Sequence, residues 1–118
     1  MVTLEQIREI TRTLPRTEEA LVRDYVKFRV RGIVYASVSP DETVMGFGFP
    51  KEERADLVAA EPDKFLLPRE SDLRFHWVQV RLAAIDEQEL YELVTEAWRM
   101  CVPRKVWLPR LGPPTGPR

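Results

Sequence analysis

Basic and apolar residues alternate in the segment YVKFRVRG, residues 25–32. Successive side chains of a strand point to opposite faces, so Lys27 and Arg29 share one face and the apolar residues share the other. Cations on a sheet face can meet the phosphates of a nucleic acid, and aromatic rings beside them can stack on its bases. The pattern is also typical of an ordinary solvated face, because Lys and Arg stems cover apolar surface while their charged ends stay in water.

Residues from other segments can extend this basic face. Arg31 lies at the tip of a predicted hairpin, where it can reach a groove or the backbone of DNA. The segment RFHWVQVRL, residues 74–82, predicts a later strand that adds an aromatic and a basic side chain. The candidate DNA-binding residues are Lys27, Arg29, Arg31, Tyr35, Trp77, Arg81, Arg104 and Lys105. DNA, bound largely by charge, is therefore one expected partner.

A second interpretation rests on the segment VMGFGF, residues 44–49, which alternates as a strand. With Met45 and Phe47 directed inward, Gly46 and Gly48 leave the outer face bare, so that a ligand can approach closely. Together with Trp77 these glycines predict an alternative site for a small molecule or a protein. Packing under a helix or loop is the other interpretation of Trp77.

Few residues have the types and spacing that catalysis requires. His76, the one histidine, alternates onto the apolar face of its predicted strand, and Cys101 ends an apolar helical stripe. The acidic pairs at 18–19 and 52–53 fall where helices are expected to begin, and there the helix dipole accounts for them. The sequence has no Gly-rich phosphate loop and no spacing of metal ligands. We therefore expect no enzymatic activity, no cofactor and no metal.

The composition is that of one small domain. A chain of 118 residues with 44% hydrophobic residues can bury a core that needs no disulfide or metal ion to stabilise it. Its single cysteine excludes an internal disulfide framework. No apolar run approaches the roughly 20 residues that span a bilayer, and the amphipathic start MVTLEQIREI lacks the apolar core of a signal peptide. We expect a cytoplasmic protein with no membrane partner.

The charge is unevenly distributed along the chain. Of 18 Lys and Arg against 19 Asp and Glu, four basic residues and no acid lie in 103–118, so residues 1–102 have a net charge of −5. Residues 1–105 are expected to form the domain, and 106–118 a basic tail rich in Pro and Gly whose last ten residues are extended or disordered. Trp107 either anchors this tail on the domain or belongs to a partner motif.

The first third of the chain predicts a helix followed by a hairpin. Thr3 and Gln6 have the spacing of a capping box, apolar residues recur at helical spacing as far as Leu14, and Pro15 stops the helix. Residues 16–24 are expected to form a short turn or loop, with Thr17 as a possible cap.

Two registers suit the hairpin of residues 25–38. A two-residue turn at 31–32 pairs Val30 with Ile33, whereas a three-residue loop with Gly32 in the left-handed conformation pairs Phe28 with Val34. We favour the three-residue loop because it keeps the apolar side chains on one face. It places Tyr35 on the basic face.

The remaining segments alternate between helix and strand. Pro50 opens a helix that runs to about Ala60, and DKFLLP, residues 63–68, forms a short strand or extended loop. Asp86 caps a final helix that reaches Cys101. The expected buried residues are Ala55, Leu57, Val58 and Ala59 in the first of these helices, His76, Val78, Val80 and Leu82 in the strand, and Leu90, Leu93, Val94, Ala97, Trp98 and Cys101 in the last helix. The fold class is α+β, a mainly antiparallel sheet with helices packed on one face.

This order of elements resembles the MmcQ/YjbR family of small bacterial proteins. The resemblance is carried by LPRTEEA, FRVRGIVYASV, PKEERADLV and HWVQVRLAAIDEQELYELVTEAWRMCVPRK, within residues 10–105. It implies a fold like that of the bacterial frataxin homologues, with hairpins arranged as a double wing, and a role in DNA binding. The chain departs from the family at Ile33, where members often have a basic residue.

Overall fold

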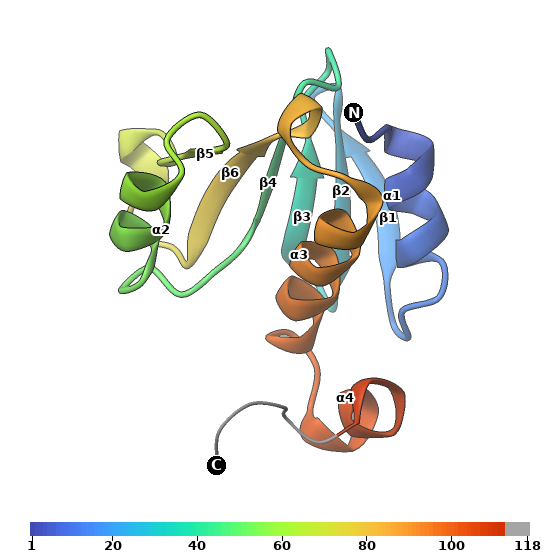
Figure 1. Cartoon of the computed structure of the whole chain (residues 1–118). Helices are drawn as coiled ribbons and strands as arrows, with labels where there is room; N and C mark the ends of the chain where they lie inside the picture. Colours follow the sequence, from blue (N-terminus) through green and yellow to red (C-terminus); the bar gives the residue numbers. More distant parts are fainter. Residues whose placement is uncertain (113–118) are drawn as a thin grey trace.

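The computed structural model describes residues 1–112, which form a six-stranded sheet with helices against it (Figure 1). The elements are α1 (Leu4–Thr11), β1 (Glu18–Val22), β2 (Tyr25–Val30), β3 (Ile33–Val38), β4 (Val44–Gly48), α2 (Arg54–Ala60), β5 (Phe65–Leu66), η1 (Glu70–Asp72), β6 (Trp77–Arg81), η2 (Leu82–Ala84), α3 (Glu87–Arg99) and α4 (Arg104–Leu111). The α+β class expected from the sequence is confirmed.

All the strand pairings are antiparallel, and the strand order is β1-β2-β3-β4-β6-β5. The first four strands form a continuous meander, and β6 then pairs with β4, so the segment that contains α2 and β5 loops out at one side. Figure 1 shows α1 and α3 on the same face of the sheet and α2 at the edge beside β5. Within residues 1–112, no helix lies over the opposite face of β2, β3 and β4 (Figure 1).

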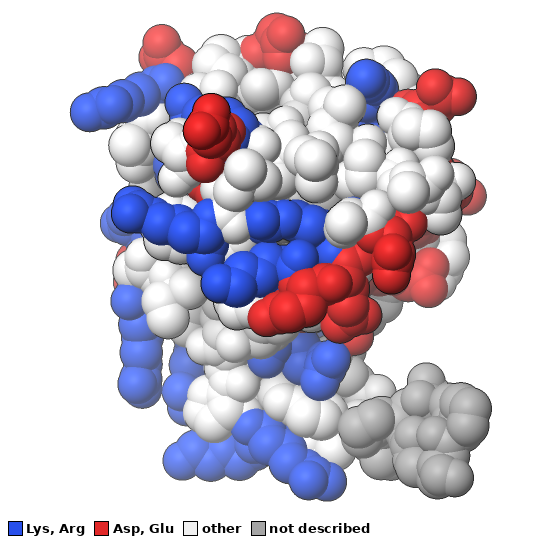
Figure 2. Space-filling view, turned by 90° about the vertical axis from the view of Figure 1, so that its left-hand side faces the viewer, with Lys and Arg blue, Asp and Glu red and all other residues white. Residues whose placement is uncertain are grey.

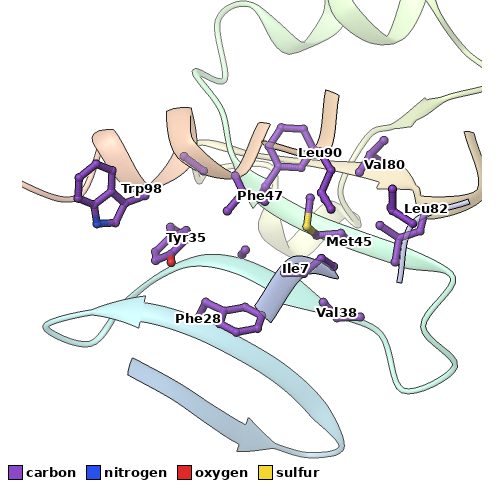
Figure 3. Packing of buried hydrophobic residues seen from close by; sticks show 14 of the residues in the cluster. Ile7, Phe28, Tyr35, Val38, Met45, Phe47, Val80, Leu82, Leu90 and Trp98 are labelled. Atoms are coloured by element: carbon purple, nitrogen blue, oxygen red, sulfur yellow. The ribbon is translucent and has the colours of Figure 1, made fainter. Parts of the chain in front are cut away.

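The hydrophobic core lies between α1, α3 and one face of the sheet. Figure 3 shows side chains of α3 and of the sheet pointing toward one another, with Trp98 and Tyr35 at one end. Phe28, Ala36, Phe47 and Val78 lie in one row across four strands, and all of them are buried. This row defines the inner face, and the row beside it on each strand belongs to the outer face.

The helix caps predicted at Thr3 and Asp86 are present, whereas Thr17 caps no helix because strand β1 follows it. Thr3 accepts a hydrogen bond from the amide of Gln6, Gln6 accepts one from the amide of Thr3, and Asp86 accepts one from the amide of Glu89. The first helix ends at Thr11, earlier than expected. Its last predicted apolar residue, Leu14, is nevertheless buried beyond the helix end.

Residues 18–22 form strand β1, so the predicted turn or loop was wrong. Arg23 and Asp24 both have positive φ, 51° and 69°, which makes them the two-residue turn that joins β1 to β2. Glu18 and Glu19 lie at the start of this strand and not at a helix N-terminus, so the helix dipole does not account for them. Glu18 lies near Arg29, and Glu19 accepts hydrogen bonds from Arg8 of α1.

The favoured hairpin register was also wrong. Arg31 and Gly32, with φ of 51° and 80°, form a two-residue turn in which Val30 faces Ile33. The register then shifts between Phe28 and Arg29, so that Phe28 faces Ala36. This bulge accommodates one extra residue in β3 and brings the apolar set back to one face without the three-residue loop.

The later elements are shorter than expected. The α2 helix begins at Arg54, which is buried, while Ala55 and Ala59 are exposed and Leu57 and Val58 are half-buried. The β6 strand begins at Trp77. His76 therefore precedes the strand and is exposed, so its predicted place on the apolar face was wrong, whereas Val78, Val80 and Leu82 are buried as predicted.

The C-terminal segment is helical where it is described. Helix α4 runs across position 105 and includes Pro109, so the start of the segment expected to be extended is helical instead. Trp107 packs against the core, with the guanidinium of Arg99 over its ring at 5.1 Å. The rest of the predicted tail, residues 113–118, lies outside the described residues. Within residues 1–112, no helix has the length and apolar character needed to cross a membrane.

Candidate nucleic-acid interface

The outer face of the sheet is the candidate site. We use this name for the strand side chains that point away from α1 and α3. The register places on it Glu18, Ala20 and Val22 of β1, Tyr25, Lys27 and Arg29 of β2, Ser37 of β3, Val44 and Gly46 of β4, and Trp77, Gln79 and Arg81 of β6. These strand positions hold three basic residues and one acidic residue, although the whole chain has a net charge of −1.

Lys27 and Arg29 lie side by side on β2, and both are half-buried. The Nε of Arg29 is 3.6 Å from a carboxylate oxygen of Glu18 and has no hydrogen-bond partner within the described residues. Lys27 lies between Ala20 and Ser37 in its row and forms no salt bridge in the described part of the chain. The positive charge of this pair is therefore opposed by one carboxylate.

Arg81 lies at the other side of the same face. It is exposed, faces Val44 of β4, and makes no ion pair with any residue of 1–112. Three strand spacings separate β2 from β6, which amounts to about 14 Å. The structure thus brings Lys27, Arg29 and Arg81 onto one face but in two groups.

Trp77 covers the centre of this face. A Cβ added to Gly46 would lie 2.6 Å from the indole Nε1, so the ring rests on the glycine, which is buried. Gly48 lies instead beside Ala97 of α3, at 3.7 Å from the added Cβ to that methyl group. The expectation that both glycines leave the outer face bare was wrong, because another side chain or a helix lies against each of them.

Tyr35 does not lie on the outer face. The bulge turns its side chain inward, where it is fully buried and its hydroxyl forms a 2.9 Å hydrogen bond with the hydroxyl of Thr17. Burial raises the pKa of Tyr35 to about 12. A ring in this position cannot stack on a base. Tyr35 is therefore a core residue, and not the DNA-contacting residue that the alternation of side chains along the strand predicted.

The other three predicted contacts lie away from the outer face. Arg31 is exposed in the β2–β3 turn, and Arg104 and Lys105 are exposed at the start of α4. Figure 1 shows α4 beyond the end of α3, at the end of the molecule where β3 begins. These three residues therefore extend a basic end of the molecule and do not join the sheet group.

Basic residues are also grouped on the side of the molecule that carries α2. Figure 2 shows a band of Lys and Arg beside a diagonal run of Asp and Glu, and below that run the coloured side chains are basic. Basic and acidic side chains lie close together on this side of the molecule. On the outer face, by contrast, the strand residues include one acid, Glu18.

Arg54 positions part of the site and was missed by the sequence reasoning. Its buried guanidinium donates hydrogen bonds to the carbonyl oxygens of Leu73, Phe75 (2.8 Å) and Trp77 (3.3 Å). These bonds hold the segment that leads into β6 and so help to place the indole over Gly46. Helical periodicity alone gives no signal for such a role, because an arginine in a short helix is usually solvated.

The residues considered for catalysis are not assembled into a site. The Nδ1 of His76 accepts a hydrogen bond from the amide of Lys51 at 3.0 Å and lies 3.8 Å from a carboxylate oxygen of Glu52. Burial raises the pKa of the Cys101 thiol, which disfavours the reactive thiolate. Among the described residues, no three His, Cys, Asp or Glu side chains gather as a metal ion would require.

Comparison with known proteins identifies the family. A crystal structure of Deinococcus radiodurans protein DR2400, which has a DUF419 domain, matches 97% of this chain and 83% of its own, with a TM-score of 0.74 and 20% sequence identity. At that identity the similarity shows a shared fold. No functionally curated protein matches the chain. The YjbR family model matches residues 12–100, which is most of the sequence, and this chain therefore belongs to the YjbR family.

Proposed function

We propose that this YjbR-family protein is not an enzyme and binds the phosphate backbone of duplex DNA through the outer face of its sheet. The observation that carries the proposal is the charge of that face: Lys27, Arg29 and Arg81 project from a surface that α1 and α3 leave open, opposed by Glu18 alone among its strand residues. Phosphates are the partners that such an arrangement favours.

The spacing of the basic groups suits a duplex. Strands β2 and β6 are about 14 Å apart, and Arg81 lies two residues along from the row of Lys27, so these two positions are roughly 16 Å apart, somewhat more than the major-groove width of about 12 Å. Lys27 on β2 and Arg81 on β6 can therefore meet phosphates on the two sides of one groove.

Base readout has little support in this geometry. Tyr35 is buried, and one side of the half-buried Trp77 ring rests on Gly46, which leaves little aromatic surface for stacking on bases. Binding is therefore expected to depend on charge and to have low sequence preference.

A titration of a fluorescently labelled duplex with the full chain, followed by anisotropy at several salt concentrations, tests the proposal. Binding at low salt should weaken steeply as salt is added. The slope of the logarithm of the binding constant against the logarithm of the salt concentration should decrease in magnitude by about 0.9 for each phosphate that the protein no longer neutralises. The double variant Lys27→Ala/Arg81→Ala should therefore decrease it by about 1.8, with reduced affinity for every duplex sequence.

Arg12→Ala is the matched control. Arg12 is exposed at the end of α1, on the opposite side of the sheet, where it pairs with Glu5 at 3.0 Å, and its change removes one positive charge away from the proposed contact. It should leave DNA binding nearly unchanged. Absence of binding at low salt, or an equal loss per charge in the control and in the double variant, would contradict the proposal.

A further inference from the structure

The two edges of the sheet differ. The β5 edge is two residues long and is followed by Leu67 and Pro68, features that discourage further strand pairing. The β1 edge pairs with β2 over all five residues without a register shift and contains neither proline nor lysine. Its other side has no partner strand among the described residues. Glu18 and Glu19 are its only devices against strand addition, since no proline, bulge or covering strand protects it among the described residues.

The free backbone groups of β1 can be assigned from its turn. In a two-residue hairpin the residues that flank the turn, here Val22 and Tyr25, form a hydrogen-bonded pair. Hydrogen-bonded and non-bonded positions alternate along the ladder. The N–H and C=O groups of Glu19 and Leu21 consequently point outward, away from β2. The Leu21 side chain is 70% exposed beside them.

We infer that a second copy of this chain pairs with the β1 edge, antiparallel and about a two-fold axis at Ala20. In this register Glu19 faces Leu21 of the partner subunit, and Leu21 faces Glu19 of the partner subunit. The outward groups then form four backbone hydrogen bonds. The axis is perpendicular to the sheet, so like faces of the two sheets are continuous and the contact is self-complementary.

Charge favours a second copy as the occupant of this edge. The strand begins with Glu18 and Glu19 and is followed by the exposed turn residues Arg23 and Asp24, of which Arg23 forms no ion pair within residues 1–112. Antiparallel pairing brings Arg23 of the partner subunit alongside the acidic start of β1. Arg8 already accompanies Glu19, which limits the repulsion between the two acidic ends.

The dimer does not depend on DNA binding, because β1 contributes none of the basic residues of the proposed DNA contact. Sedimentation equilibrium of the full chain without DNA, at about 10 µM to 1 mM, covers the range of weak self-association. The mass is expected to rise from 13.8 kDa toward twice that value. A chain that stays monomeric throughout this range overturns the inference.

Leu21→Pro tests the register. It removes an outward N–H while the hydrogen bonds to β2 remain, and should raise the dimer dissociation constant at least about tenfold. Leu21→Lys places a charge on the same edge and gives a second test if the proline variant fails to fold. Circular dichroism reports folding for both.

Leu67→Lys is the control, since Leu67 is 50% exposed next to the other edge of the sheet. It should leave the dimer unchanged. A dimer that survives Leu21→Lys, or one that dissociates equally in Leu67→Lys, would place the contact elsewhere and overturn the inference.

Discussion

The two faces of the sheet are organised differently. On the inner face, Phe28, Phe47 and Val78 are at most 1% exposed because α1 and α3 lie over them. On the outer face no helix of the described part of the chain lies over β2, β3 and β4, yet Ser37 is 9% exposed and Gly46 is also buried. The indole of Trp77 lies over Gly46.

This difference shows that an uncovered sheet face need not be a bare one. The inner face is buried by other elements, so its stability depends on apolar volume. The outer face is buried by its own side chains, so its shape depends on which residues lie opposite one another across the strands. Substitutions on the two faces should therefore have effects of different size and kind.

The largest effect is expected from the inner face. Phe47→Ala removes a ring that packs edge-to-face with those of Phe49 and Phe65, and leaves a cavity in a core that α3 closes. It should lower the free energy of unfolding by about 3–5 kcal/mol, measured by urea denaturation. Lys27→Ala, on the outer face, should change it by no more than about 0.5 kcal/mol. Similar losses in the two variants would contradict the comparison.

An intermediate effect is expected where the outer face covers itself. In Gly46→Ala the new methyl group would lie 2.6 Å from the Trp77 indole, so the ring must move. The loss of stability should be about 1–3 kcal/mol, as for overpacking. The Trp77 indole N–H resonance, identified by its absence in Trp77→Ala, should shift.

The same glycine substitution in a Trp77→Ala background provides the control. Without the indole nothing opposes the methyl group, and alanine is then at least as stable in a strand as glycine. Equal destabilisation of both backgrounds would show that the indole does not cover Gly46.

The smallest effect is expected at Tyr35, which strand alternation placed on the outer face but which is buried on the inner face. Tyr35→Phe removes the hydrogen bond to Thr17 and should cost about 1 kcal/mol at neutral pH. The folded-state pKa of about 12 exceeds the ordinary value of 10.0, so folding favours the neutral phenol. This contribution is complete below pH 10 and is lost as the pH rises toward 12.

Urea denaturation at about pH 8 and about pH 11 measures this difference. The wild-type protein should lose more stability between these two values than Tyr35→Phe, which has no phenol at this position to ionise. An identical pH dependence in the two proteins would mean that Tyr35 is not held neutral in the fold.

Local patterns predicted much of the inner face. The caps at Thr3 and Asp86 and the alternation of Met45 with Phe47 depend on neighbours within four residues, so they can be recognised without a tertiary structure. The basic residues Lys27 and Arg29 were placed on the outer face by the same period-two rule.

The missed residues depend on neighbours distant in sequence. Residues 18–22 became a strand because they pair with β2, and a bulge in the β2–β3 pairing turned Tyr35 inward. Arg54 is buried because carbonyl groups around 20 residues later accept its hydrogen bonds. No local period carries such information.

The sequence by itself thus determined the α+β class, the starts of α1 and α3 and the sign of the charge on β2, because each follows from short-range geometry. Only the tertiary structure decided which side chains meet on the outer face. Strand pairing brought Arg81 onto the same face as Lys27, separated Arg104 and Lys105 from them, and laid Trp77 over Gly46. The physical reason is that register and bulges determine which residues meet across strands, and these are settled by packing of the whole sheet.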